Sequence, residues 1–105
     1  MHPKKTIDFK RGLKTLATEQ GWLVDIVSED RKPTERLVIY YKEGHEPVRI
    51  SSFVLKQDEK EINPGIARRI VRHIRMLMDE DNAAPICLLD ERRAILVTWI
   101  NNFFS

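Results

Sequence analysis

The sequence has little cysteine and little glycine, and each shortage excludes a kind of site. Cys87 is the only cysteine among 105 residues, so no disulfide can form within the chain. Its neighbours Ile86, Leu88 and Leu89 predict a buried, unreactive thiol. The four glycines stand singly, which excludes a glycine-rich loop that cradles phosphate groups.

Long apolar runs and metal-ligand patterns are also missing. No apolar run approaches the roughly 20 residues that span a bilayer, and the start "MHPKKTIDFKRG" lacks the apolar segment of a signal peptide. We therefore expect a cytoplasmic protein without membrane contact. The three histidines, His2, His45 and His73, have no metal-ligand spacing, so we expect no metal site and no cofactor.

The composition that remains is that of an ordinary globular domain, 42% hydrophobic and 32% charged. A net charge of +2 does not by itself indicate nucleic-acid binding, because the distribution of charge matters more than its total. We predict a single domain over residues 1–105. Its expected parts are a flexible basic arm (1–6), a core (8–78) and a C-terminal apolar element (85–105).

The first half of the chain predicts one helix followed by three strands. Apolar residues recur at helical spacing over residues 8–20, Gly21 follows as a stop, and Thr6 or Asp8 is a candidate cap. Runs rich in β-branched and aromatic residues then predict strands over 22–28, 36–42 and 48–55, and their short links favour an antiparallel meander.

Alternation along the third predicted strand indicates which side chains share a face. Strand side chains point to opposite faces in turn, so one face would carry Val48, Ile50, Ser52 and Val54. Arg49 and Ser51 would point the other way. Aromatic residues such as Tyr40 or Phe53 become candidates for stacking against bases if one sheet face is left uncovered.

The stretch "EINPGIARRIVRHIRMLMDE" predicts a two-faced helix. Asn63 is a favourable N-cap and Pro64 suits the first helical position. At 100° per residue the apolar side chains fall within one arc, and the helix is expected to end near Met78. Three arginines share the opposite side, with a fourth arginine and a histidine on its flank: Arg68, Arg72, Arg75, Arg69 and His73.

The tail "APICLLDERRAILVTWINNFFS" is apolar enough to be buried, against the core or against a second copy of the chain. It fits a helix capped by Asp90 or, less well, a hairpin around "DERR". Four large apolar residues near its end are candidates for a self-association interface: Trp99, Ile100, Phe103 and Phe104.

Together these elements predict an α+β fold, an α-β-β-β-α core whose three-stranded antiparallel sheet carries both helices on one face, with an additional C-terminal element. This order is that of the double-stranded-RNA-binding fold. Two stretches, "LATEQGW" and "VRISSFVLKQDEKEINPGIARRIVRHI", resemble the HicA family of small bacterial toxins, which are RNA-cleaving enzymes built on this fold. The resemblance spans roughly residues 8–76.

The catalytic part of the family pattern is missing here. The family carries a catalytic histidine in a Gly-Ser-His motif at the first hairpin, where this chain reads "SEDRKPTER". Lysine and threonine do not replace a histidine that acts as a general acid or base. The resemblance therefore implies the fold and contact with nucleic acid, and it does not imply catalysis.

The expected function is non-catalytic binding of structured RNA or DNA through the basic side of the second helix. Amides at the helix start, near Gly65, would add phosphate-facing donors. The expected nucleic-acid-binding residues are Arg68, Arg69, Arg72, Arg75, Lys4, Lys5, Lys10, Arg11 and Lys14. Two alternatives stay open: a protein-interaction module that docks on an acidic partner or forms a homodimer through its tail, and a ribonuclease that uses His45 or His73.

Overall fold

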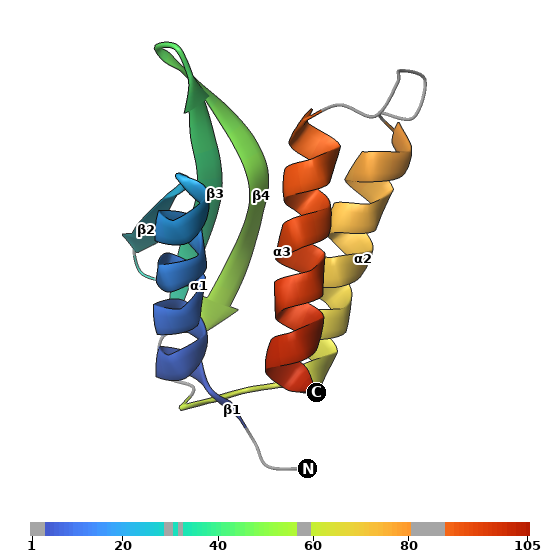
Figure 1. Ribbon diagram of the computed structural model, residues 1–105. Helices are drawn as coiled ribbons and strands as arrows, with labels where there is room; N and C mark the ends of the chain where they lie inside the picture. The colour runs from blue at the N-terminus through green and yellow to red at the C-terminus, as the bar shows by residue number, and fades with distance from the viewer. Residues whose placement is uncertain (1–3, 29–30, 32, 57–59, 81–87) are drawn as a thin grey trace. The chain divides into compact units, whose positions relative to one another are not determined.

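Figure 1 shows the computed structural model of the chain, which describes residues 4–28, 31, 33–56, 60–80 and 88–105. The predicted α+β class, the three-stranded antiparallel sheet and the additional C-terminal helix are confirmed. The chain divides into two compact units, Met1–Ile62 and Asn63–Ser105. The first unit holds α1 and all the strands, and the second holds α2 and α3. Cys87 lies outside the described residues.

Helix α1 (Thr6–Gln20) ends where the sequence predicts. Gly21 adopts a left-handed conformation with φ of 77°, which glycine reaches at no steric cost. The Trp22 amide then donates to the Ala17 carbonyl at 2.7 Å, so the final turn closes and the chain passes directly into a strand.

The start of α1 differs from the prediction because the preceding residues pair with a distant strand. Lys5 is the N-cap and no side chain caps the helix, so the caps expected at Thr6 or Asp8 are wrong. Strand β1 (Lys4–Lys5) pairs antiparallel with β5 (Glu61–Ile62), and the Thr6 amide donates to the Lys60 carbonyl at 2.9 Å. Residues 4–6 therefore belong to the fold and not to a flexible arm.

Strands β2 (Leu23–Ser28), β3 (Thr34–Glu43) and β4 (Glu46–Lys56) form the predicted meander in the order β2-β3-β4. Both β3 and β4 are longer than the sequence pattern indicates. The chain turns tightly at Gly44, whose φ is 67°, so β3 and β4 stay paired up to the turn, where Glu43 pairs with Glu46.

A β-bulge in β4 overturns the alternation predicted for that strand. Ile39 pairs with Ser51 but the next residue, Tyr40, pairs with Arg49, so Ile50 is an extra residue with no partner. The residues buried in β4 are Ile50, Ser51, Phe53 and Leu55, whereas Val54 is 38% exposed. The expectation that Val48, Ile50, Ser52 and Val54 share one face is therefore wrong.

Helix α1 covers one face of the sheet (Figure 1). Phe9, fully buried, meets Phe53 of β4 edge-on with ring centroids 6.0 Å apart. Lys10 forms an ion pair with Glu35 of β3 at the margin of this contact. Burial of the two rings contributes the largest stabilisation here, on the order of 1.5–3 kcal/mol for each aromatic side chain.

The second unit is a pair of packed helices, α2 (Pro64–Glu80) and α3 (Leu88–Phe104). Within this unit α2 packs against α3. The helical interpretation of the tail is confirmed and the hairpin is wrong. Because α3 begins at Leu88, Asp90 lies in its first turn rather than at the cap, and it lies 3.6 Å from Arg93. Among the described helices, none is long and apolar enough to cross a membrane.

Candidate nucleic-acid interface

Local sequence at Asn63 fixes where α2 begins. The Asn63 side-chain oxygen Oδ1 accepts a hydrogen bond from the Gly65 amide at 2.8 Å, and its carbonyl accepts one from the Ile66 amide at 2.9 Å. Pro64 occupies the first helical position, where its missing N–H costs nothing. The predicted cap is confirmed. The same hydrogen bonds occupy the first amides of α2, so the phosphate-facing donors expected near Gly65 are absent there.

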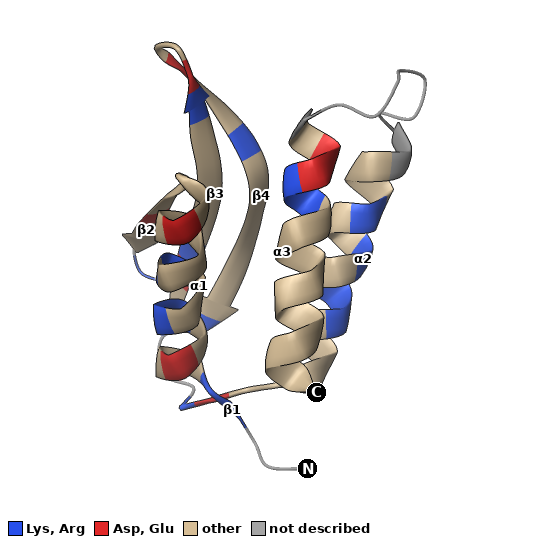
Figure 2. Ribbon diagram, viewed as in Figure 1, with Lys and Arg blue, Asp and Glu red and all other residues tan. Residues whose placement is uncertain are grey.

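Helix α2 is two-faced, as the sequence predicts. One side is buried and apolar, with Ala67, Ile70, Val71 and Ile74 all under 9% exposed. The other side is exposed and basic, and Figure 2 shows its charges as a row of blue bands along the helix. We call this side the basic face of α2, and its members are Arg68, Arg69, Arg72, His73 and Arg75.

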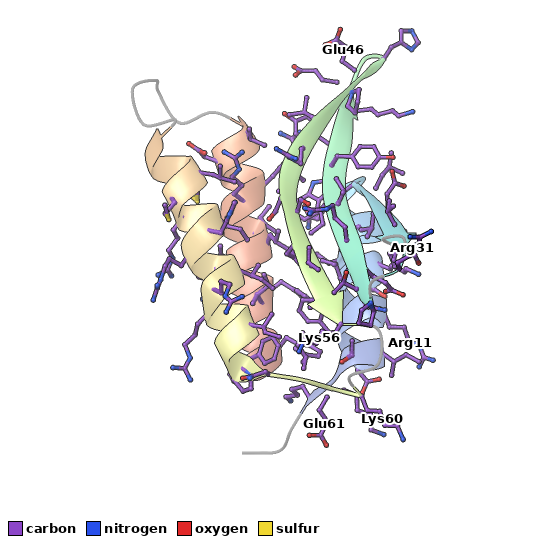
Figure 3. The ribbon with its side chains drawn as sticks, turned by 180° about the vertical axis from the view of Figure 1, so that it is seen from behind. Arg11, Arg31, Glu46, Lys56, Lys60 and Glu61 are labelled. Atoms are coloured by element: carbon purple, nitrogen blue, oxygen red, sulfur yellow. The ribbon has the colours of Figure 1, made fainter. Side chains whose placement is uncertain are left out.

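Two properties make the basic face available to a ligand. All five side chains are exposed, and among the carboxylates whose side chains the structure describes, none forms an ion pair with the four arginines. Nitrogen-bearing side chains project outward from α2 in Figure 3. Arg68, Arg72 and Arg75 follow one another at roughly 6 Å and 4.5 Å along the helix axis. Phosphates of one nucleic-acid strand advance about 3.4 Å per nucleotide along the duplex, so three arginines in a row can each reach a phosphate.

The auxiliary cations expected at the N-terminal end lie in the first unit, and they are not equivalent. Lys5, Arg11 and Lys14 are exposed. Lys10 is half-buried and its ammonium group binds Glu35, so it stabilises the attachment of α1 to the sheet. Lys4 is half-buried within the short β1–β5 pair.

The four candidate interface residues at the end of α3 differ in exposure. Ile100 is 1% exposed, so it is part of the core of the chain. Trp99, Phe103 and Phe104 are half-buried and form a ring cluster. Trp99 stacks on Phe103 at 5.5 Å between centroids, and Phe103 meets Phe104 edge-on at 5.0 Å. We call these three residues the aromatic cluster of α3.

A second surface, which the sequence reasoning did not assemble, lies on the face of the sheet opposite α1. Strand register places Leu23, Tyr40 and Arg49 in one row across the three strands, and Asp25, Val38 and Ser52 in the next. We call this surface the open face of the sheet. A shallow depression on it is lined by Asp25, Val38, Tyr40, Lys42, His45, Pro47 and Arg49.

The bulge in β4 is what brings Arg49 to this surface. If every residue of β4 were paired in regular alternation, Ile50 would lie opposite Tyr40, and Arg49 would share the α1-facing side with Ser51. With Ile50 inserted, Arg49 lies directly opposite Tyr40 and is exposed. Tyr40 was a candidate stacking residue from the sequence alone. The bulge was not predictable from the sequence of β4, because the strand contains no glycine, a residue that often marks a bulge.

Tyr40 and Asp25 interact on the open face. Partial burial raises the pKa of Tyr40 above its usual value of 10.0, and a hydrogen bond to Asp25 and the negative charge of that carboxylate raise it further. The phenol therefore stays protonated at neutral pH and donates to the Asp25 carboxylate. Phe53, the other candidate for stacking, is 7% exposed and packs on α1 instead.

The two candidate histidines lie on different units. His45 is exposed beside the depression of the open face, and His73 is exposed on α2. The described residues contain no group of three or more histidine, cysteine, aspartate or glutamate side chains that could hold a metal ion.

No family model matches the sequence, and no curated protein or solved structure is significantly similar to the chain. The likeness to the HicA family accordingly stays a prediction. What can be proposed about function depends on the two surfaces just described.

Proposed function

We propose that this protein binds structured RNA or DNA, without cleaving it, through the basic face of α2. The observation that carries the proposal is a row of exposed arginines opposite a buried apolar stripe, with no ion pair to a carboxylate whose side chain the structure describes. Arg68, Arg72 and Arg75 are the principal phosphate contacts, and Arg69 is auxiliary. Lys5, Arg11 and Lys14 are auxiliary cations on the first unit.

Phosphate contacts of this kind set affinity and orientation, with little sequence specificity. Each arginine that neutralises a phosphate releases a counterion, so affinity falls steeply as the salt concentration rises. A cytoplasmic location, where nucleic acid is accessible, belongs to this proposal. The resemblance to the HicA family supports the choice of nucleic acid over an acidic protein, and the missing Gly-Ser-His motif supports binding without cleavage.

The salt dependence of binding to a short duplex tests the proposal. In the variant with Arg68, Arg72 and Arg75 all changed to Gln, log K should fall less steeply with log salt. The slope should become less negative by roughly 0.9 for each arginine lost. Arg31→Gln is the matched control, since Arg31 is an exposed cation in the turn between β2 and β3, outside both surfaces (Figure 3). An unchanged slope and affinity in the triple variant would refute the proposal.

A second candidate function is self-association through the aromatic cluster of α3. Half-buried rings at the end of a helix, together with the exposed Met76 of α2 at 57% and Ile95 of α3 at 36%, favour it. Light scattering coupled to size exclusion measures the mass directly. A dimer that dissociates in Phe104→Lys would support this function, and a monomer at all protein concentrations would refute it.

A further inference from the structure

The open face of the sheet differs in its chemistry from the basic face of α2. It combines one half-buried aromatic ring, two cations and one carboxylate around a shallow depression, all contributed by the first unit. A row of phosphates requires cations alone, as on α2. A surface that also offers a ring and a hydrogen-bond acceptor fits a ligand with a planar face, N–H donors and an anionic group.

We propose that this depression binds one unpaired nucleotide, with its base stacked on Tyr40, its Watson–Crick edge on Asp25 and its phosphate between Lys42 and Arg49. The site does not rest on the function proposed for α2. It adds recognition of an exposed base to a protein whose other surface reads only the backbone.

Position and burial support stacking on Tyr40. The ring is half-buried, and its neighbours across the strands are Leu23, 43% exposed, and Arg49. Because directly opposite side chains in an antiparallel sheet stand about 5 Å apart, these neighbours flank a base that lies on the ring. The Asp25 carboxylate lies beside the phenol, and this contact is one cause of the raised pKa of Tyr40.

The carboxylate gives the site a preference among bases. Asp25 accepts hydrogen bonds and donates none when ionised. Guanine presents two adjacent N–H donors, N1–H and N2–H, which match the two oxygens of a carboxylate. Uracil presents a single N–H between two carbonyl oxygens, which a carboxylate repels. We therefore expect guanine to bind better than uracil.

The cations complete the match with a nucleotide. Lys42 lies two residues after Tyr40 on the same face of β3, and Arg49 lies opposite Tyr40 on β4. Both side chains are exposed, while Asp25 is the only acidic residue that lines the depression. The surplus of positive charge beside the ring is complementary to a phosphate attached to a stacked base.

The test uses the full chain and two short single-stranded RNAs of equal length, one with guanines at its centre and one of uridines only. Fluorescence anisotropy measures affinity, and amide NMR shifts locate the binding site. The guanine RNA should bind more tightly and shift residues of the open face. Tyr40→Ala should weaken its binding by roughly 5- to 150-fold, the range expected for loss of one base–aromatic stack. Tyr40→Phe should retain most of the affinity.

Two further variants separate recognition of the base from attraction of an anion. Asp25→Asn should reduce the preference for guanine over uridine, and Arg49→Gln should weaken both RNAs equally. Arg31→Gln, which removes a charge outside the open face, should change neither.

The proposal is overturned if neither RNA shifts the open face, or if ribose 5-phosphate shifts the same residues to the same extent. It is also overturned if Tyr40→Ala leaves affinity unchanged. The triple glutamine variant of α2 separates the two proposals, because it should bind the guanine RNA on the open face even where duplex binding is lost. Shifts on α2 alone would support the function of α2 and refute the site on the sheet.

Discussion

At the scale of single residues, Asn63 has the clearest assigned role. Its side chain and its carbonyl together satisfy two amides at the start of α2. This cap was predictable from sequence, because "NPG" before an apolar period is a local pattern that needs no knowledge of the rest of the fold. The start of α1 was not predictable in the same way, since the Thr6 amide bonds to Lys60, 54 positions away in a part of the chain that the local sequence does not specify.

Asn63→Ala should lower the free energy of unfolding by about 1 kcal/mol, the usual cost of removing an N-cap side chain. Urea denaturation monitored by circular dichroism measures the loss. The slope of the free energy of unfolding against urea concentration should stay unchanged. Asn63→Asp keeps an oxygen acceptor at the cap and should be nearly neutral. Equal destabilisation by both substitutions would contradict the role given to the side-chain oxygen.

The raised pKa of Tyr40 predicts a specific dependence of stability on pH. The folded state holds the phenolic proton more tightly than the unfolded chain, whose tyrosine titrates near its usual value of 10.0. The corresponding stabilisation is fully present below about pH 10 and is lost as the pH rises through the folded pKa.

Ultraviolet difference titration of the phenol in the native protein checks this expectation, with Tyr40→Phe identifying which transition belongs to Tyr40. Asp25→Asn should lower the pKa of Tyr40, because it removes the negative charge beside the phenol. A titration curve for Asp25→Asn identical to that of the unmodified chain would be inconsistent with the contact.

At the scale of elements, periodicity predicted the helices well and the faces of β4 poorly. The apolar stripe of α2 is fixed by a helical repeat within the segment itself. The faces of β4 depend on a bulge, and a bulge is defined by the pairing of two strands rather than by the sequence of one. Sequence reasoning therefore identified the basic face of α2 and did not assemble the open face of the sheet, apart from Tyr40.

The register of β4 with β3 yields a prediction that compares two neighbouring residues. Phe53→Ala should destabilise the protein by about 3–5 kcal/mol, because it leaves a cavity against Phe9. Val54→Ala, one position along, should cost under about 1 kcal/mol, since Val54 is 38% exposed. Chemical denaturation of both variants measures the two costs, and equal costs would contradict the faces assigned to these two residues.

At the scale of the whole molecule, the two proposed surfaces belong to different compact units. The length and composition of the chain predict one domain, and they do not show how contacts are distributed along it. The basic face of α2 offers charge alone, whereas the open face of the sheet offers a ring, an acceptor and charge.

Binding through the two surfaces should therefore be additive. Combining Tyr40→Ala with the triple glutamine variant of α2 should give losses in binding free energy that sum to within about 0.5 kcal/mol of the separate losses. Anisotropy titrations with a duplex that carries a single-stranded guanine end provide the measurement. A combined loss clearly smaller than the sum would show that both sets of residues contribute to one shared contact.

The extra residue in β4 also bears on how such a surface can change. Deleting Ile50 would restore a regular ladder in which Arg49 still lies opposite Tyr40, and it would remove one fully buried side chain. The pairing of the two strands, and not only residue identity, thus decides which side chain lies beside Tyr40. Natural loss of this single codon would keep the polar surface and cost the protein part of its core.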